Sequence, residues 1–163
     1  MKAVQKQKPD ITVALVHWGS DGNDNISKSQ ESIRNLLYEY GTDAIIGTHP
    51  HYLHKIEYNA EAGTLCAFSL GDFIGDAPEE GMNYSIILDM EITKDNTTGE
   101  ASITGYSYTP IFTVIEQDKP VRVVRIHEAI AAYEAGYIEA VSKENYETMK
   151  RVLTRIDERI AGN

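Results

Sequence analysis

Two apolar runs mark the first part of the chain, and a histidine motif follows each of them. Residues 11–17 are almost continuously apolar and β-branched, and residues 43–47 repeat this character. Such runs are typical of parallel strands that are covered on both faces. The carboxyl ends of neighbouring parallel strands lie at one edge of a sheet, where open α/β folds bind ligands. The pattern therefore predicts that the segments after both runs lie side by side.

Residues between these two strands follow the period of a helix. Ser27 followed by Gln30 resembles a capping box and indicates where the helix begins. Gly41 stands where a helix commonly ends. The predicted buried face consists of apolar residues at spacings of three and four, namely Ile33, Leu36, Leu37 and Tyr40. The first part of the chain is thus predicted to be a strand–helix–strand unit.

Further along, the chain favours strands first and helices afterwards. Residues 64–70 predict a third strand, which ends in Gly71-Asp72-Phe73, and residues 83–108 predict a β-hairpin. Residues 128–137 and 142–161 have helical patterns. The last segment shows one apolar stripe, which comprises Tyr146, Met149, Leu153, Ile156 and Ile160. This order predicts a mixed α/β fold with helices outside the sheets.

Composition and charge narrow the class of protein. The chain has 163 residues, of which 42% are hydrophobic, and it carries 15 Lys and Arg against 25 Asp and Glu, a net charge of -10. A surface this acidic repels a phosphate backbone, so we expect no nucleic-acid partner. No apolar run approaches the roughly 20 residues of a membrane span, so none is expected. The single cysteine, Cys66, lies in an apolar stretch and is expected to be buried and inert.

Three histidines are the main candidates for chemistry. His17 ends the first strand, and His49 and His51 follow the second. Neutral imidazole is the commonest protein ligand for a transition metal. Pro50 favours extended backbone at His49, and on extended backbone the side chains of His49 and His51 point the same way. Gly47 would let the backbone approach a ligand closely. For His17, a hydrogen-bonded position near the core edge is an equally good interpretation.

Several other polar residues are secondary candidates. Asp72 ends the third strand, where it could orient a ligating imidazole or cap the next segment. Asp21 and Asp24 could line the mouth of the site, although loop acids are commonly just solvated. We expect His54 to support the site from behind or to be exposed, and His127 to be structural. The sequence contains no glycine-rich phosphate loop, nucleophile elbow or His-Glu-x-x-His motif.

At these residues the chain resembles a known family. Three stretches carry the resemblance, in this order: Val16-His17-Trp18-Gly19, Gly47-Thr48-His49-Pro50-His51 and Ser69-Leu70-Gly71-Asp72-Phe73. They are similar to the bacterial capsule-synthesis and poly-γ-glutamate biosynthesis family of CapA-like proteins, within the calcineurin-like metallophosphoesterase superfamily. The resemblance runs from about residue 5 to about residue 130. It implies a two-metal site on a four-layer α-β-β-α sandwich.

The resemblance also implies roles for individual residues. His17, His49 and His51 match metal-ligand positions, and His49 and Asp72 are the implied catalytic residues. The implied cofactor is a divalent metal, Mn, Zn or Fe, and the substrate is a phosphoester or the capsule polymer. Such metal pairs generate a hydroxide and stabilise a phosphoryl oxygen. Asp72 stands where the family usually has Asn. The resemblance suggests the extracytoplasmic side of the cell envelope as the location.

The resemblance covers only the C-terminal half of the family's fold. We expect residues 1–127 to form the C-terminal half of the metallophosphoesterase-like domain, and residues 128–163 a helical extension packed on it. The N-terminal half would supply further metal ligands, including a bridging carboxylate, so the isolated chain is expected to hold metal weakly or not at all. A half sandwich exposes apolar sheet, so the expected partner is the missing half or a second copy of the chain. The alternative is a non-catalytic structural or polymer-handling component of capsule assembly.

Overall fold

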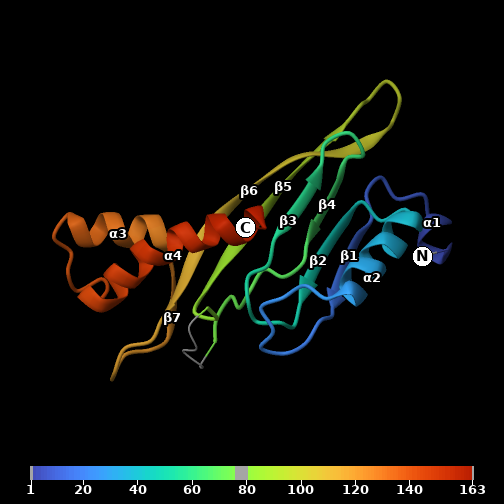
Figure 1. The fold of residues 1–163 in the computed structure, drawn as a ribbon. Helices are drawn as coiled ribbons and strands as arrows, with labels where there is room; N and C mark the ends of the chain where they lie inside the picture. The colour runs from blue at the N-terminus through green and yellow to red at the C-terminus, as the bar shows by residue number, and fades with distance from the viewer. Residues whose placement is uncertain (1, 76–80, 163) are drawn as a thin grey trace.

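The computed structural model describes residues 2–75 and 81–162, and its first part is a four-stranded sheet (Figure 1). The strand order is β1-β2-β4-β3. Its strands are β1 (Val13–His17), β2 (Ala44–Thr48), β3 (Ile56–Asn59) and β4 (Thr64–Ala67). β1, β2 and β4 run parallel, and β3 pairs antiparallel with β4. The predicted strand–helix–strand unit is confirmed, whereas the short strand β3 was not predicted. A short helix, α1 (Lys2–Gln5), precedes the sheet.

The connecting helix α2 (Lys28–Glu39) begins at the predicted capping box. Ser27 Oγ accepts from the Gln30 backbone N–H at 3.2 Å, and Gln30 Oε1 accepts from the Ser27 backbone N–H at 2.9 Å. The predicted buried face of this helix is largely wrong. Leu37 and its neighbour Tyr38 pack against the sheet, while the exposed apolar residues of the predicted face are Ile33, Leu36 and Tyr40. In this orientation of the helix, Arg34, next to Ile33, lies on the side of β3 and pairs with Glu57.

A second, antiparallel sheet has the order β5-β6-β7. Its strands are β5 (Tyr84–Lys94), β6 (Ala101–Val114) and β7 (Arg122–Arg125). The predicted hairpin is confirmed, but β6 continues past the predicted end at residue 108. It continues because Pro110, Ile111 and Phe112 still pair with the first residues of β5. In Figure 1 the two long strands extend beyond the other elements as one twisted arm.

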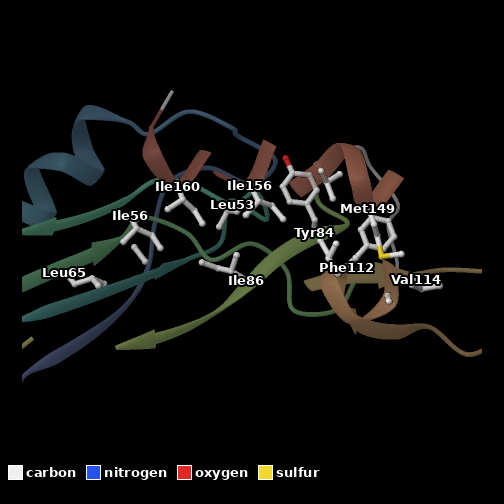
Figure 2. Packing of buried hydrophobic residues seen from close by; sticks show 14 of the residues in the cluster. Leu53, Ile56, Leu65, Tyr84, Ile86, Phe112, Val114, Met149, Ile156 and Ile160 are labelled. Carbon is white, nitrogen blue, oxygen red and sulfur yellow. The ribbon is translucent and has the colours of Figure 1, made fainter. Parts of the chain in front are cut away.

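Two helices complete the fold: α3 (Ile126–Glu134) and α4 (Lys143–Ala161). The apolar stripe of α4 is confirmed in its main part, since Met149 and Ile156 are fully buried, whereas Leu153 is half-buried. Figure 2 shows Met149, Ile156 and Ile160 of α4 in one cluster with Tyr84, Ile86 and Phe112 of the second sheet and with Leu53 and Ile56 of the first sheet region, while Leu65 lies farther along the same cluster. α3 begins at Ile126, so the expected helical extension from residue 128 starts inside this helix. None of the helices in the described part is long and apolar enough to cross a membrane.

The first sheet has a different neighbour on each face. One face packs against α2 through a cluster of Trp18, Ile45, Cys66 and Phe68. The other face contributes Ala44, Leu65 and Ala67 to the larger core shared with the second sheet and α4. The arrangement is a mixed α/β fold that forms part of an α/β sandwich.

β1 is less covered than its sequence predicts. Within the described residues it pairs with β2 alone and lies at the end of the sheet. Ala14 and Val16 pack toward α2, but Val13 is 43% exposed and Leu15 is 80% exposed. The prediction that β1 is covered on both faces is therefore wrong. Its apolar sequence suits burial on both faces, but the second sheet covers β2 and β4 and does not extend over β1.

Candidate functional site

The indole of Trp18 ties three strand ends together at the edge of the first sheet. Trp18 follows β1, and its Nε1–H donates to the carbonyl oxygen of Phe68, just after β4, at 2.8 Å. The indole crosses Gly47 of β2, where an added Cβ would lie closer than 3.0 Å to both partners. Gly47 thus makes room for the indole, and not for the ligand that the sequence analysis expected there. The indole thereby holds together the ends of β1, β2 and β4. His17 is the last residue of β1, and His49 and Asp72 follow β2 and β4.

All three candidate histidines meet at this edge, as predicted. The ring centroids of His17 and His49 are 4.2 Å apart with an interplanar angle of 34°, and those of His49 and His51 are 6.5 Å apart. His17 is exposed and the other two are half-buried. The parallel pairing of β1 and β2, in which His17 lies opposite Thr48, brings the rings together.

The backbone that presents His49 and His51 is not extended. Their φ angles are +102° and +66°, so both lie in the left-handed region that side chains other than glycine rarely adopt. The sequence argument from extended backbone and Pro50 is therefore wrong in its geometry, although the two rings do lie near each other. Each such residue costs about 1–3 kcal/mol, and such strain concentrates at functional sites. The tight turn around the buried Pro50 imposes these angles.

Asp72 holds the imidazole of His51. Its two carboxylate oxygens lie 2.8 and 3.0 Å from His51 Nδ1. A bridge between Leu53 and Leu70 brings the two segments together. The first of the two roles considered for Asp72, that of orienting an imidazole, is the one this geometry favours. With the proton on Nδ1, the lone pair of His51 is on Nε2.

A second carboxylate lies on the other side of the same ring. Asp21 Oδ1 is 3.2 Å from His51 Nε2, as expected of a loop acid at the mouth of the site. A neutral ring that donates from Nδ1 has only a lone pair on Nε2, which repels a carboxylate oxygen. With protons on both ring nitrogens, His51 would donate to Asp72 on one side and to Asp21 on the other. Asp24, the other loop acid considered, points instead to Arg159.

His54 lies behind the site and is not exposed. Only 3% of its surface is accessible, and its Nε2–H donates to the carbonyl oxygen of Asn23 at 3.1 Å. Its backbone N–H donates to the carbonyl oxygen of Ser69. Burial lowers the pKa of His54, because the charged ring would lose its hydration. Of the two alternatives for His54, exposure is wrong, and support of the site from behind stays a prediction. His127 is exposed on α3.

The donor set for a metal is incomplete. Within residues 2–75 and 81–162, no group of three or more His, Cys, Asp or Glu side chains is arranged to hold a metal ion. The rings of His17, His49 and His51 are gathered, yet their nitrogens do not converge as a ligand set. Cys66 does not supplement them, because it is buried and burial raises the pKa of its thiol to about 12. The ligand roles of the three histidines stay a prediction.

One residue that the sequence did not indicate contacts both the loop after β1 and the loop after β2. Arg159, in the last turn of α4, reaches Asp24 in one loop and Leu53 in the other. A basic residue at the end of a helix is usually explained by the helix dipole, and no local pattern indicates so distant a contact.

Comparison with known proteins relates the chain to capsule synthesis. Residues 1–77, which include all three histidines and Asp72, match the family described as "Bacterial capsule synthesis protein PGA_cap". The chain is 33% identical over 100 residues to "PGA biosynthesis protein CapA" of Bacillus subtilis (strain 168), a match that covers 61% of this chain and 25% of that protein. It is 31% identical over 75 residues to "Capsule biosynthesis protein CapA" of Bacillus anthracis, covering 46% and 18%. The matches therefore span a quarter or less of these relatives.

Proposed function

This chain is a CapA-like capsule biosynthesis family protein, and on that premise we propose that it supplies the histidine side of a phosphoesterase-type divalent-metal site. The proposal places this site in capsule or poly-γ-glutamate biosynthesis at the cell envelope. The observation that supports it best is the gathering of His17, His49 and His51 at one sheet edge. A bound divalent ion would lower the pKa of a water molecule and stabilise charge on a phosphoryl oxygen.

In this proposal the residues of the chain bind and orient. His49 and His17 present adjacent rings, and Asp72 keeps the proton of His51 on Nδ1 so that Nε2 remains available as a ligand. Asp21 Oδ1, 3.2 Å from His51 Nε2, places a carboxylate oxygen beside this ligand position. The strained backbone at His49 and His51 also supports a functional rather than a purely structural role.

We further propose that the remaining ligands come from the part of the CapA-like protein outside these 163 residues. Two surfaces of the first sheet support this partner. Val13 and Leu15 expose apolar side chains on the free edge strand β1. A second apolar surface lies on α2 and consists of Ile33, Leu36 and Tyr40. It is on the side of the helix away from Arg34, whose guanidinium reaches β3. The two surfaces lie on opposite sides of the sheet, because Ala14 and Val16 face α2 and Val13 and Leu15 face away from it. A strand added beside β1, with further elements packed on both sides of it, would cover them and bring its own end to the histidines.

The alternative function is a non-catalytic, polymer-handling component of capsule assembly. The absence of a closed three-ligand set in the described part of the chain favours it. Kinship in fold does not by itself establish chemistry.

Metal titration together with hydrolysis of a generic phosphodiester separates the two functions. We expect the chain alone to bind Mn²⁺ or Zn²⁺ weakly, and His49→Ala or His51→Ala to abolish that binding. His127→Ala, on the exposed surface of α3, is the matched control and should leave it unchanged. Hydrolysis by the chain alone should stay near background. Adding the N-terminal segment of a CapA protein should raise metal affinity and hydrolysis together.

Three outcomes would contradict parts of these proposals. If the completed protein neither binds metal nor hydrolyses the diester, the phosphoesterase proposal is wrong and the polymer-handling function is favoured. If the chain alone shows strong metal-dependent turnover that His51→Ala removes, the ligands need not come from outside it. If sedimentation finds a stable homodimer, and a substitution of Leu15 dissociates it, the partner is a second copy of the chain.

A further inference from the structure

Two loops present the residues of the candidate site, and the C-terminal helix touches both. The β1–α2 loop (residues 18–27) carries Asp21, and the β2–β3 loop (residues 49–55) carries His49 and His51. Both loops lack helix and strand, apart from the bridge at Leu53, so contacts with other elements must fix their relative position.

Arg159 makes these contacts from the last turn of α4. Its Nη2–H donates to Asp24 Oδ2 at 2.8 Å, its Nη1–H pairs with the other oxygen of Asp24, and Nη1 also donates to the Leu53 carbonyl oxygen at 3.3 Å. The guanidinium lies 5.7 Å from the ring centroid of Tyr52, and Nε–H donates to the hydroxyl of Tyr84 at 2.9 Å. One side chain therefore contacts the β1–α2 loop, the β2–β3 loop and β5.

We propose that Arg159 is a positioning residue that sets the distance between the two loops and thereby the arrangement of Asp21, His49 and His51. The metal-binding part of this inference rests on the proposed function. The paired geometry requires arginine, because its planar guanidinium holds both oxygens of Asp24 while a further N–H reaches Leu53. A lysine offers a single point charge and cannot hold all of these partners at once.

The salt bridge is shielded from water on the side of the arginine. The side chain of Arg159 is 24% exposed, whereas that of Asp24 is 47% exposed. The hydrogen bond with Arg159 holds the pKa of Asp24 below its ordinary value. Beneath the pair, His54 joins the same two loops through its bond to Asn23. Arg159 and His54 thus act on the two loops from adjacent positions.

The location of Arg159 on α4 has a consequence for the site. α4 packs on the core through Met149, Val152 and Ile156, far along the chain from the histidines. Any displacement of the last turn of α4 is transmitted by the guanidinium to both loops. The C-terminal helix therefore contributes to the site without supplying a ligand.

The test compares Arg159→Ala and Arg159→Lys with two controls on the same helix. Arg151→Ala removes an exposed arginine whose partner is Thr148 on its own helix, and Leu153→Ala lowers stability without touching either loop. The readouts are the affinity for Mn²⁺ or Zn²⁺, the NMR cross-relaxation between the His17 and His49 rings, and amide exchange in the two loops.

We expect Arg159→Ala to weaken metal binding about 10- to 100-fold, the range for residues that orient metal-binding side chains. It should also reduce the cross-relaxation between the rings and accelerate exchange in both loops. Arg159→Lys should recover only part of each signal. If Arg159→Ala fails to fold, Asp24→Asn takes its place in the test and should show the same losses. Neither control should change the metal affinity.

The inference would be overturned if Arg159→Ala lowered stability while ring contacts and loop exchange stayed as in the wild type. It would also be overturned if Leu153→Ala weakened metal binding as strongly, because the effect would then follow stability alone. If the wild-type chain binds no metal by itself, the ring contacts and the loop exchange decide the role of Arg159, while the proposed function is decided separately by metal binding to the completed protein.

Discussion

Gly47→Ala should disrupt the crossing that aligns the three strand ends. The new Cβ would lie closer than 3.0 Å to the carbonyl oxygen of Phe68 and to the indole nitrogen of Trp18. One of these atoms belongs to the backbone, so rotation of a side chain cannot relieve both overlaps. The strand must shift, or the indole must leave its hydrogen bond.

The expected cost follows from two effects. Leaving the buried carbonyl and indole N–H without a partner costs about 1–3 kcal/mol. Forcing a methyl group into a packed region costs about 1–3 kcal/mol more. The loss of unfolded-state entropy on replacing glycine returns about 0.4–1 kcal/mol. The net loss should therefore be about 1–6 kcal/mol, a large share of the roughly 5–15 kcal/mol by which domains are stable.

Urea unfolding followed by tryptophan emission measures this effect directly, because Trp18 is the single tryptophan of the chain. In the folded variant its emission should shift to the red as the indole loses its buried position. Gly105→Ala is the matched control, since it also adds a methyl group to a strand and the nearest atom it meets is the flexible end of Glu91 at 2.8 Å. A Gly47→Ala protein as stable as Gly105→Ala, with unchanged emission, would refute the reasoning.

Three further predictions concern stability. Met149→Ala should cost about 2–5 kcal/mol in urea unfolding because Met149 is fully buried, and Leu153→Ala should cost less because Leu153 is half-buried; equal losses would contradict this. Burial lowers the pKa of His54 from 6.5, so below pH 6.5 the folded state binds fewer protons than the unfolded state. The free energy of unfolding should therefore fall as the pH drops through 6.5. His54→Gln should weaken this pH dependence. Burial alone would raise the pKa of Glu116, but hydrogen bonds from Lys119 and other neighbours lower it to about 2. The contribution of Glu116 to the free energy of unfolding is therefore complete above pH 4.5 and disappears as the pH falls toward 2. Glu116→Gln should lack this loss of stability in acid.

Local patterns in the sequence were enough for several elements. The capping box at Ser27 predicts the start of α2, because the partners of a cap are only three residues apart. The turn between β5 and β6 predicts the hairpin for the same reason. The helical stripe that contains Met149 predicts which side of α4 is buried. The meeting of His17 with His49 also follows from sequence, since two buried parallel strands with a connecting helix have little choice of arrangement.

Contacts between distant segments decided the rest. The face of α2 that is buried depends on how Leu37 and Tyr38 pack against the cluster of the first sheet, which brings Arg34 to Glu57 on the unpredicted strand β3. The exposure of Leu15 depends on how far the second sheet extends over β1. The left-handed backbone at His49 is imposed by a turn whose cost is met by the surrounding fold, against the local preference of the residue before a proline.

The sequence by itself determined most of the elements, though not the short strand β3, and the edge at which the histidines gather, because these depend on interactions within a few residues and on the handedness of strand–helix–strand units. Only the tertiary structure decided that Gly47 makes room for the Trp18 indole, that Asp72 and Asp21 flank His51, and that Arg159 joins the two loops. Each of these contacts joins residues far apart in the chain, and hydrogen bonds and packing at that range depend on side-chain positions that no local pattern contains.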